Sequence, residues 1–120
     1  MLEFYGYAKC DTCRRAKRAL DEAGIAYREI DITVDPPRFA ELQAWRKGEL
    51  IELKQLLNTN GVDYRRLKMS EKVQKLPEQE VLKLLAHNGR LLKRPIITDG
   101  KRVTVGFKNP GAILAAWIER

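Results

Sequence analysis

The spacing of apolar residues divides the first part of the chain into a strand, a helix and a second strand. Residues 2–6 (LEFYG) form a short and mostly apolar run, which is typical of a buried strand. Residues 12–23 carry alanine and leucine at helical spacing, and Gly24 directly after them is typical of a helix end. Residues 25–32 alternate in part between apolar and polar side chains, which favours a second strand. This order predicts two parallel strands joined by a right-handed crossover.

The middle of the chain predicts helices. Apolar residues recur at helical spacing between Phe39 and Trp45, and a second apolar segment extends from Leu50 to Leu57. Another helix is expected at Pro77, because proline suits the first turn of a helix. The residues expected on its inward face are Val81, Leu82 and Leu85. Asp35-Pro36-Pro37 is expected to start this helical region, and Gly48 is expected to interrupt it. Asn58-Thr59-Asn60-Gly61 is a loop signal, and Asn88-Gly89 is expected to end the last of these helices.

The last part of the chain predicts a β-hairpin and a final helix. Two β-rich runs, residues 96–98 and 102–105, flank Asp99-Gly100, and Asp-Gly in this position indicates a two-residue hairpin turn. Asn109-Pro110 is expected to supply the cap and the first residue of a helix. The apolar face expected for that helix consists of Ala112, Ile113, Ala116 and Trp117.

The predicted order is β-α-β, a helical stretch and then β-β-α, which is the order of a thioredoxin-like fold. We therefore expect an α/β fold with a mixed four-stranded sheet. A chain of 120 residues with 44% hydrophobic content favours one ordered domain, here residues 1–120. Residues 33–90 are expected to be a helical insertion in this domain, because the region is short and its helices have apolar faces to bury.

Composition narrows the cellular setting. No segment approaches the roughly 20 apolar residues of a membrane span, and the first ten residues lack the pattern of a signal peptide. We expect a cytoplasmic protein, in which a disulfide is more often redox-active than structural.

The net charge is +7, and 15 of the 23 basic residues lie within residues 9–18, 65–75 and 90–102. Such clusters attract an anion, an acidic partner or nucleic acid, although each is also compatible with an ordinary solvated face.

The chemistry of the chain centres on Cys10 and Cys13, its only two cysteines. They stand where the first strand meets the first helix, and a helix N-terminus favours a thiolate over a thiol. Lys9, Arg14 and Arg15 add positive charge nearby. The C-x-x-C spacing therefore predicts that Cys10 attacks a substrate and that Cys13 displaces the resulting adduct as a disulfide forms.

Two alternatives to redox chemistry are weaker. A zinc site needs about four ligands, and beyond the two cysteines the chain offers one histidine, His87, so no metal site is expected. The other alternative is that the two cysteines share this spacing by chance. The strand–helix context favours redox chemistry over both.

Several segments together resemble the arsenate reductase (ArsC)/Spx/MgsR/YffB family, which is thioredoxin-like, over nearly the whole chain. These segments are Tyr5-Gly6, CDTCRRA at 10–16, Asn58-Thr59-Asn60-Gly61 with Tyr64-Arg65, LKRPII at 92–97 and VGFK at 105–108. The resemblance implies a thioredoxin-like domain with a helical insertion and Cys10 as the reactive thiol.

The resemblance also implies an anion site. Arg65 and Arg94 match two of the three arginines that surround the thiol in glutaredoxin-linked arsenate reductases. Arg66 is an equal candidate to Arg65 on charge alone. Near the place of the third arginine stands Lys108, a point charge without the two-pronged geometry of a guanidinium. Lys9 is expected to contribute to anion binding. In thioredoxin-like folds a cis-proline lies opposite the cysteine, and Pro95 is expected to take this structural place.

Two functions are compatible with these features. The first is an ArsC-like thiol-dependent oxidoreductase that reduces an oxyanion or a disulfide, with glutathione, glutaredoxin or thioredoxin as electron donor and no bound cofactor. The second is an Spx- or MgsR-type redox-sensing regulator that binds the C-terminal domain of the RNA polymerase α subunit. Direct nucleic-acid binding ranks lower, because the chain has neither a helix-turn-helix nor basic residues interleaved with aromatic ones. We expect a monomer.

Overall fold

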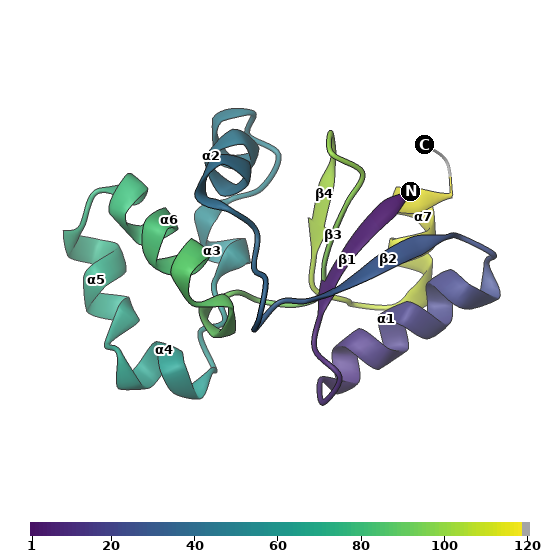
Figure 1. The fold of residues 1–120 in the computed structure, drawn as a ribbon, viewed down its shortest axis with the longest axis horizontal. Helices are drawn as coiled ribbons and strands as arrows, with labels where there is room; N and C mark the ends of the chain where they lie inside the picture. Colours follow the sequence, from purple (N-terminus) through teal and green to yellow (C-terminus); the bar gives the residue numbers. More distant parts are fainter. Residues whose placement is uncertain (119–120) are drawn as a thin grey trace. The chain divides into compact units, whose positions relative to one another are not determined.

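The computed structural model describes residues 1–118 of the chain, which divide into two compact units (Figure 1). The first unit combines the two ends of the chain, residues 1–31 and the segment that starts at Arg94. The second unit is Ile32–Lys93 and contains the predicted helical insertion, residues 33–90. That both units form one domain stays a prediction.

The first unit contains a mixed four-stranded sheet, as the sequence predicts. Its elements are β1 (Leu2–Gly6), α1 (Asp11–Glu22), β2 (Tyr27–Asp31), β3 (Ile96–Thr98), β4 (Val103–Val105) and α7 (Pro110–Trp117). The strand order is β2-β1-β3-β4, with β1 parallel to β2 and antiparallel to β3, and with β3 antiparallel to β4. The α/β thioredoxin-like prediction is therefore confirmed.

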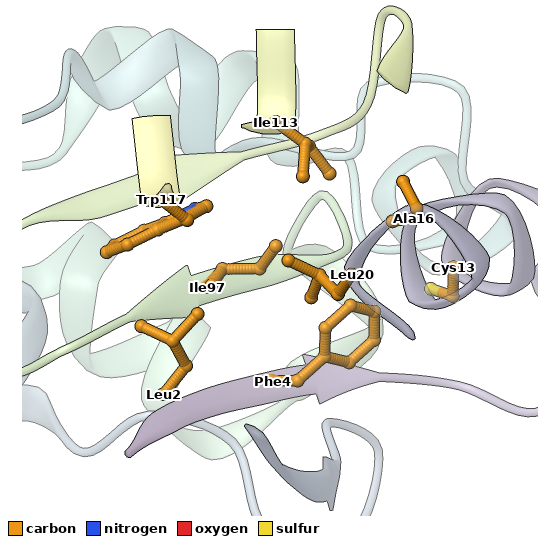
Figure 2. Packing of buried hydrophobic residues seen from close by; sticks show 9 residues of the cluster. Leu2, Phe4, Cys13, Ala16, Leu20, Ile97, Ile113 and Trp117 are labelled. Carbon is orange, nitrogen blue, oxygen red and sulfur yellow. The ribbon is translucent and has the colours of Figure 1, made fainter. Parts of the chain in front are cut away.

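One face of this sheet packs against both α1 and α7 (Figure 2). Leu2 and Phe4 point to the same face of β1 because side chains alternate along a strand. Leu20 of α1, Ile97 of β3 and Trp117 of α7 are buried against them. Other members of the cluster are Cys13, Ala16, Ala19 and Ile113. The core thus extends to the first turn of α1, where one of the two cysteines is part of it.

The second unit is helical. Its elements are α2 (Phe39–Lys47), α3 (Leu53–Leu56), α4 (Val62–Arg66), α5 (Met69–Lys75), α6 (Glu78–His87) and the short 3-10 helix η1 (Gly89–Leu91). The inward face of α6 is confirmed, because Val81, Leu82 and Leu85 are all buried. Pro77 occupies the N-cap position, one residue before the first turn expected for it. The apolar segment that extends to Leu57 is helical only over α3.

Two local predictions in the first unit are wrong. The β3–β4 hairpin has a four-residue loop, residues 99–102, since Thr98 pairs with Val103. The Asp99 side chain accepts hydrogen bonds from the backbone N–H groups of Lys101 and Arg102, at 2.9 and 2.8 Å, and this turn replaces the two-residue one. In α7, Ala112 is exposed, whereas Trp117 is buried as expected.

Within residues 1–118, no helix has the length and apolar character needed to cross a bilayer.

Candidate functional site

Cys10 is the N-cap residue of α1. The chain leaves β1 at Gly6 and turns back, with the Cys10 N–H donating to the Tyr7 carbonyl at 3.0 Å. Cys10 then adopts an extended backbone (φ −91°, ψ 114°), and its Sγ accepts a hydrogen bond from the Cys13 N–H at 3.3 Å. The sulfur therefore sits where a helix offers free N–H donors and partial positive charge, which favours an anion. Its side chain is half-buried and reaches solvent.

Cys13 occupies a different environment, although it lies one turn away. Its side chain is only 1% exposed and belongs to the core cluster (Figure 2). Gly6 leaves space for the Phe4 ring of the same cluster, since a Cβ at Gly6 would lie 2.6 Å from that ring, whereas it would be in ordinary contact with Cys13 Sγ at 3.4 Å. Burial, followed by the hydrogen bond with Cys10, raises the pKa of Cys13 to about 12. Cys13 is therefore a neutral thiol at neutral pH. Neither cysteine forms a disulfide in this structure.

Arg94 brings a positive charge to the same place. It directly precedes the buried Pro95 and β3, and the Arg94–Pro95 peptide bond is cis, as expected. Its guanidinium carbon lies 5.5 Å from the centre of the Tyr7 ring. Its electrostatic influence reaches Cys13, where it opposes the rise in pKa. Arg94 is thus near both the N-terminal turn of α1 and the buried thiol.

One nitrogen of Arg94 is without a hydrogen-bond partner. Its Nη1 atom is buried, and nothing among residues 1–118 accepts a hydrogen bond from it. An unpaired buried donor costs about 1–3 kcal/mol, and more when the group is charged. Guanidinium groups bind oxyanions through paired N–H donors. The free nitrogen is therefore suited to an anionic ligand or to a sulfur anion.

The other predicted anion-binding residues lie in less defined positions. Lys9 and Lys108 are exposed and have no ion-pair partner within the described residues. Arg65 is exposed at the end of α4 in the second unit, whereas the neighbouring Arg66 forms an ion pair with Asp63 at 3.6 Å. Of these two arginines, Arg65 is the one that has no ion-pair partner within residues 1–118. The roles of Lys9, Lys108 and Arg65 toward Cys10 stay predictions.

Sequence reasoning missed two residues at the site. Tyr7 contacts Arg94 through its ring, and Gly6 leaves room for the Phe4 ring, which belongs to the same cluster as Cys13. A glycine that ends a buried strand four residues before a cysteine was the available signal for Gly6. No pattern indicated Tyr7, because the cation–π contact joins segments nearly 90 residues apart.

The Asn58–Gly61 segment has a structural role within the second unit. The Asn58 N–H donates to the Leu91 carbonyl at 2.9 Å, and its side-chain amide donates to the Arg90 carbonyl at 3.3 Å. The Asn88 amide donates to the Asp63 carboxylate at 3.0 Å. These bonds hold α4 to η1 within the second unit.

Comparison with known proteins establishes the family of the chain. The model of the ArsC family matches residues 5–115. The chain is 49% identical over 107 residues to the uncharacterized protein YusI of Bacillus subtilis (strain 168), covering 89% of this chain and 91% of YusI. It is 30% identical over 113 residues to the regulatory protein MgsR of the same strain, covering 94% and 87% of the two chains. It is 34% identical over 107 residues to the global transcriptional regulator Spx of Enterococcus faecalis (strain ATCC 700802 / V583), covering 89% and 80%.

Solved structures show the same relationship. The crystal structure of a possible arsenate reductase from Streptococcus mutans UA159 superposes with a TM-score of 0.85 at 39% identity, covering 91% of this chain and 92% of that chain. A protein described as related to the ArsC family from Bacteroides fragilis gives a TM-score of 0.84 at 40% identity, covering 92% and 93%. The family match, the fold and the cysteine at the start of α1 lead to one conclusion: the chain belongs to the ArsC family.

Proposed function

We propose that this protein is a thiol-dependent reductase in which Cys10 is the nucleophile and Cys13 the resolving thiol. The observation that carries the proposal is the contrast between the two sulfurs. Cys10 Sγ is half-buried and accepts an N–H bond at the N-terminus of α1, whereas Cys13 is buried and protonated. Its substrate class is a disulfide or an oxyanion, which the free Nη1 of Arg94 would hold.

The reaction takes two steps. With a disulfide substrate, the Cys10 thiolate bonds to one substrate sulfur, and the other leaves as a thiolate that takes up a proton. Cys13 then loses its proton and attacks Cys10 Sγ, which releases the second substrate sulfur. Two electrons pass to the substrate, and the protein is left with a Cys10–Cys13 disulfide. A dithiol donor such as glutaredoxin or thioredoxin, or two molecules of glutathione, would reduce this disulfide and restart the cycle.

An oxyanion substrate would be reduced in the same two steps. The Cys10 sulfur replaces one oxygen, which leaves as water after protonation. When Cys13 attacks Cys10 Sγ, the bonding pair between that sulfur and the central atom stays on the central atom, which is thereby reduced by two electrons.

The pKa of Cys13 supports this order of events. Two of the causes that raise it, the hydrogen bond and the charge interaction with Cys10, depend on Cys10 as a free sulfur. Both are removed when Cys10 enters a mixed disulfide, whereas Arg94 continues to lower the pKa. The first step therefore removes two of the contributions that raise the pKa of Cys13, whereas burial, the largest one, remains.

The test is the stoichiometry of reaction with dithiobis(nitrobenzoate), which releases one coloured thiolate per attack. The reduced wild-type protein should release two equivalents and keep no adduct, because Cys13 expels the second. Cys13→Ser should release one equivalent and retain a stable adduct, measured by intact mass. Cys10→Ser should react much more slowly than either. Equal rates for the two single variants, or a lasting adduct on the wild type, would contradict the proposal.

A second candidate function is a redox-sensing regulator. The similarity to Spx and MgsR favours it, because both relatives are regulatory proteins by name. In this case the Cys10–Cys13 disulfide would change a surface that binds the C-terminal domain of the RNA polymerase α subunit. Pull-down of this domain by oxidised and reduced protein tests the idea. Binding that differs between the two states supports the regulator, and equal failure to bind removes it.

A further inference from the structure

A groove lies along one side of α1 in the first unit. Its volume is about 170 Å³, and it is lined by Arg15, Arg18, Ala19 and Glu22 of α1 and by Phe107 and Pro110. This volume is well below the roughly 300 Å³ at which pockets for small-molecule ligands begin. It is large enough for one apolar side chain, and so it suits a peptide segment better than a free small molecule.

Two of the three charged residues that line this groove are arginines, and the third is Glu22. Within residues 1–118, neither Arg15 nor Arg18 forms an ion pair with a carboxylate. Two other basic residues of the same helix do, since Arg14 pairs with Asp11 at 3.6 Å and Lys17 pairs with Glu29 at 2.5 Å. The arginines that line the groove therefore offer their donors to a molecule outside the chain.

The apolar part of the groove lining includes Phe107, which is held in place by the core. Phe107 is half-buried and packs against the core cluster that contains Cys13. The Arg15 guanidinium carbon lies 5.1 Å from the centre of the Phe107 ring. The guanidinium occupies one face of this ring, so that face is not free to stack a nucleic-acid base.

The groove is within reach of the nucleophile. With a rise of about 1.5 Å per residue, Arg15 lies about 7.5 Å and Arg18 about 12 Å along the helix from Cys10. An extended chain covers about 3.3 Å per residue, so a segment of about four residues connects Cys10 to Arg18.

We propose that this groove docks an acidic segment of the protein that exchanges thiol and disulfide with Cys10. An apolar side chain of the partner enters the groove beside Phe107, and carboxylates a few residues from the partner's cysteine pair with Arg15 and Arg18. The proposal rests on the redox function proposed for Cys10 and adds the chemical character of the partner.

The test uses short peptides whose cysteine carries a thiopyridyl group. Cys10 attacks the peptide sulfur, the bond to the pyridyl sulfur breaks, and the thiopyridone released is followed by absorbance. The acidic probe is Cys-Gly-Leu-Glu-Glu, its neutral match is Cys-Gly-Leu-Gln-Gln, and both are also made in reverse order. Full-length Cys13→Ser protein limits the reaction to one step. At low ionic strength the acidic probe should react about tenfold faster than the neutral one, with the advantage reduced by salt.

Two substitutions in this background identify the surface. Arg18→Glu should abolish the preference for the acidic probe. Lys101→Glu is the matched control, since it changes the net charge equally but lies in the β3–β4 loop, and it should keep the preference. Equal rates for the two probes, or a preference that survives Arg18→Glu, would overturn the docking proposal and leave the redox proposal standing. No release from either probe would overturn both.

Nucleic acid is tested separately, with a fluorescent single-stranded oligonucleotide. Binding that is lost in Arg18→Glu but kept in Lys101→Glu would assign the groove to nucleic acid and overturn the proposal. The expected result is no such difference.

Discussion

At the scale of single residues, the central feature is one thiol kept protonated beside another that is free to react. The raised pKa of Cys13 has a consequence for stability. The folded protein holds this proton more tightly than the unfolded chain, so the stabilisation is complete below the ordinary pKa of 9.0 and is lost as the pH rises toward about 12. The slope cannot exceed about 1.4 kcal/mol per pH unit for one proton.

Urea unfolding under reducing conditions at several pH values above about 8 measures this loss. The wild type should lose stability faster than Cys13→Ala as the pH rises above 9.0, because the variant lacks the titrating group. Parallel profiles for the two proteins would show that burial does not shift the pKa of Cys13.

Arg94 allows a second prediction at this scale. Arg94→Met removes a cation–π contact worth about 0.5–1 kcal/mol, but it also removes a buried donor whose lack of a partner costs about 1–3 kcal/mol. The free energy of unfolding should therefore fall by less than about 1 kcal/mol or rise. The rate with the anionic reporter dithiobis(nitrobenzoate) should fall about tenfold, because the reporter loses its cation.

Arg28→Met is the matched control, because Arg28 pairs with Glu3 on the sheet and its loss should leave the reporter rate unchanged. If Arg94→Met reacts as fast as the wild type, Arg94 does not serve the site.

The sequence predicts those parts of the candidate site whose residues are close together in the chain. Cys10 and Cys13 follow from their spacing, whereas Arg94 was expected from the fold and the family resemblance and not from a local pattern. The buried state of Cys13 depends on packing with Phe4 and α7, which a local pattern does not contain. The same holds for the ring of Tyr7, whose partner is far away in sequence.

At the scale of elements, α1 depends on a cysteine as its cap. Cys10 Sγ accepts the Cys13 N–H at 3.3 Å, which satisfies one of the free donors of the first turn. Cys10→Ala should therefore destabilise the protein by about 1 kcal/mol, whereas Cys10→Ser keeps an acceptor and should cost less. Chemical unfolding of both variants measures the difference. Equal stabilities would indicate that the sulfur contributes nothing as a cap.

Elements with a strong local signal were predicted well. Asn109 caps α7 through its side chain, which accepts from the Ala112 N–H at 2.9 Å. The α4 and α5 helices were not predicted, since they have five and seven residues and expose most of their side chains. The prediction of the hairpin turn was wrong because the Asp99 side chain accepts hydrogen bonds from Lys101 and Arg102, the two residues that follow Gly100. An Asp-Gly pair alone does not indicate these hydrogen bonds.

For the molecule as a whole, basic residues without an ion-pair partner predict how ionic strength affects the rate at which the protein reacts with a disulfide reagent. The net charge is +7, and Lys9, Arg15, Arg18 and Lys108 of the first unit lack carboxylate partners within residues 1–118. The reaction with anionic dithiobis(nitrobenzoate) should slow several-fold as ionic strength rises from about 0.01 M to about 0.2 M. The reaction with neutral dithiodipyridine should change little, and the same dependence for both reagents would exclude a role for these charges.

The division of labour between the two cysteines is tested most directly by site-specific alkylation of the reduced, folded wild-type protein. Iodoacetamide is applied near neutral pH, and mass spectrometry of the digested protein locates the label over time. Cys10 should be labelled first, and Cys13 should stay unlabelled until the protein is unfolded, because its thiol is buried and its pKa is raised to about 12. Labelling of Cys13 as fast as Cys10 in the folded protein would show that the two thiols do not have these separate roles.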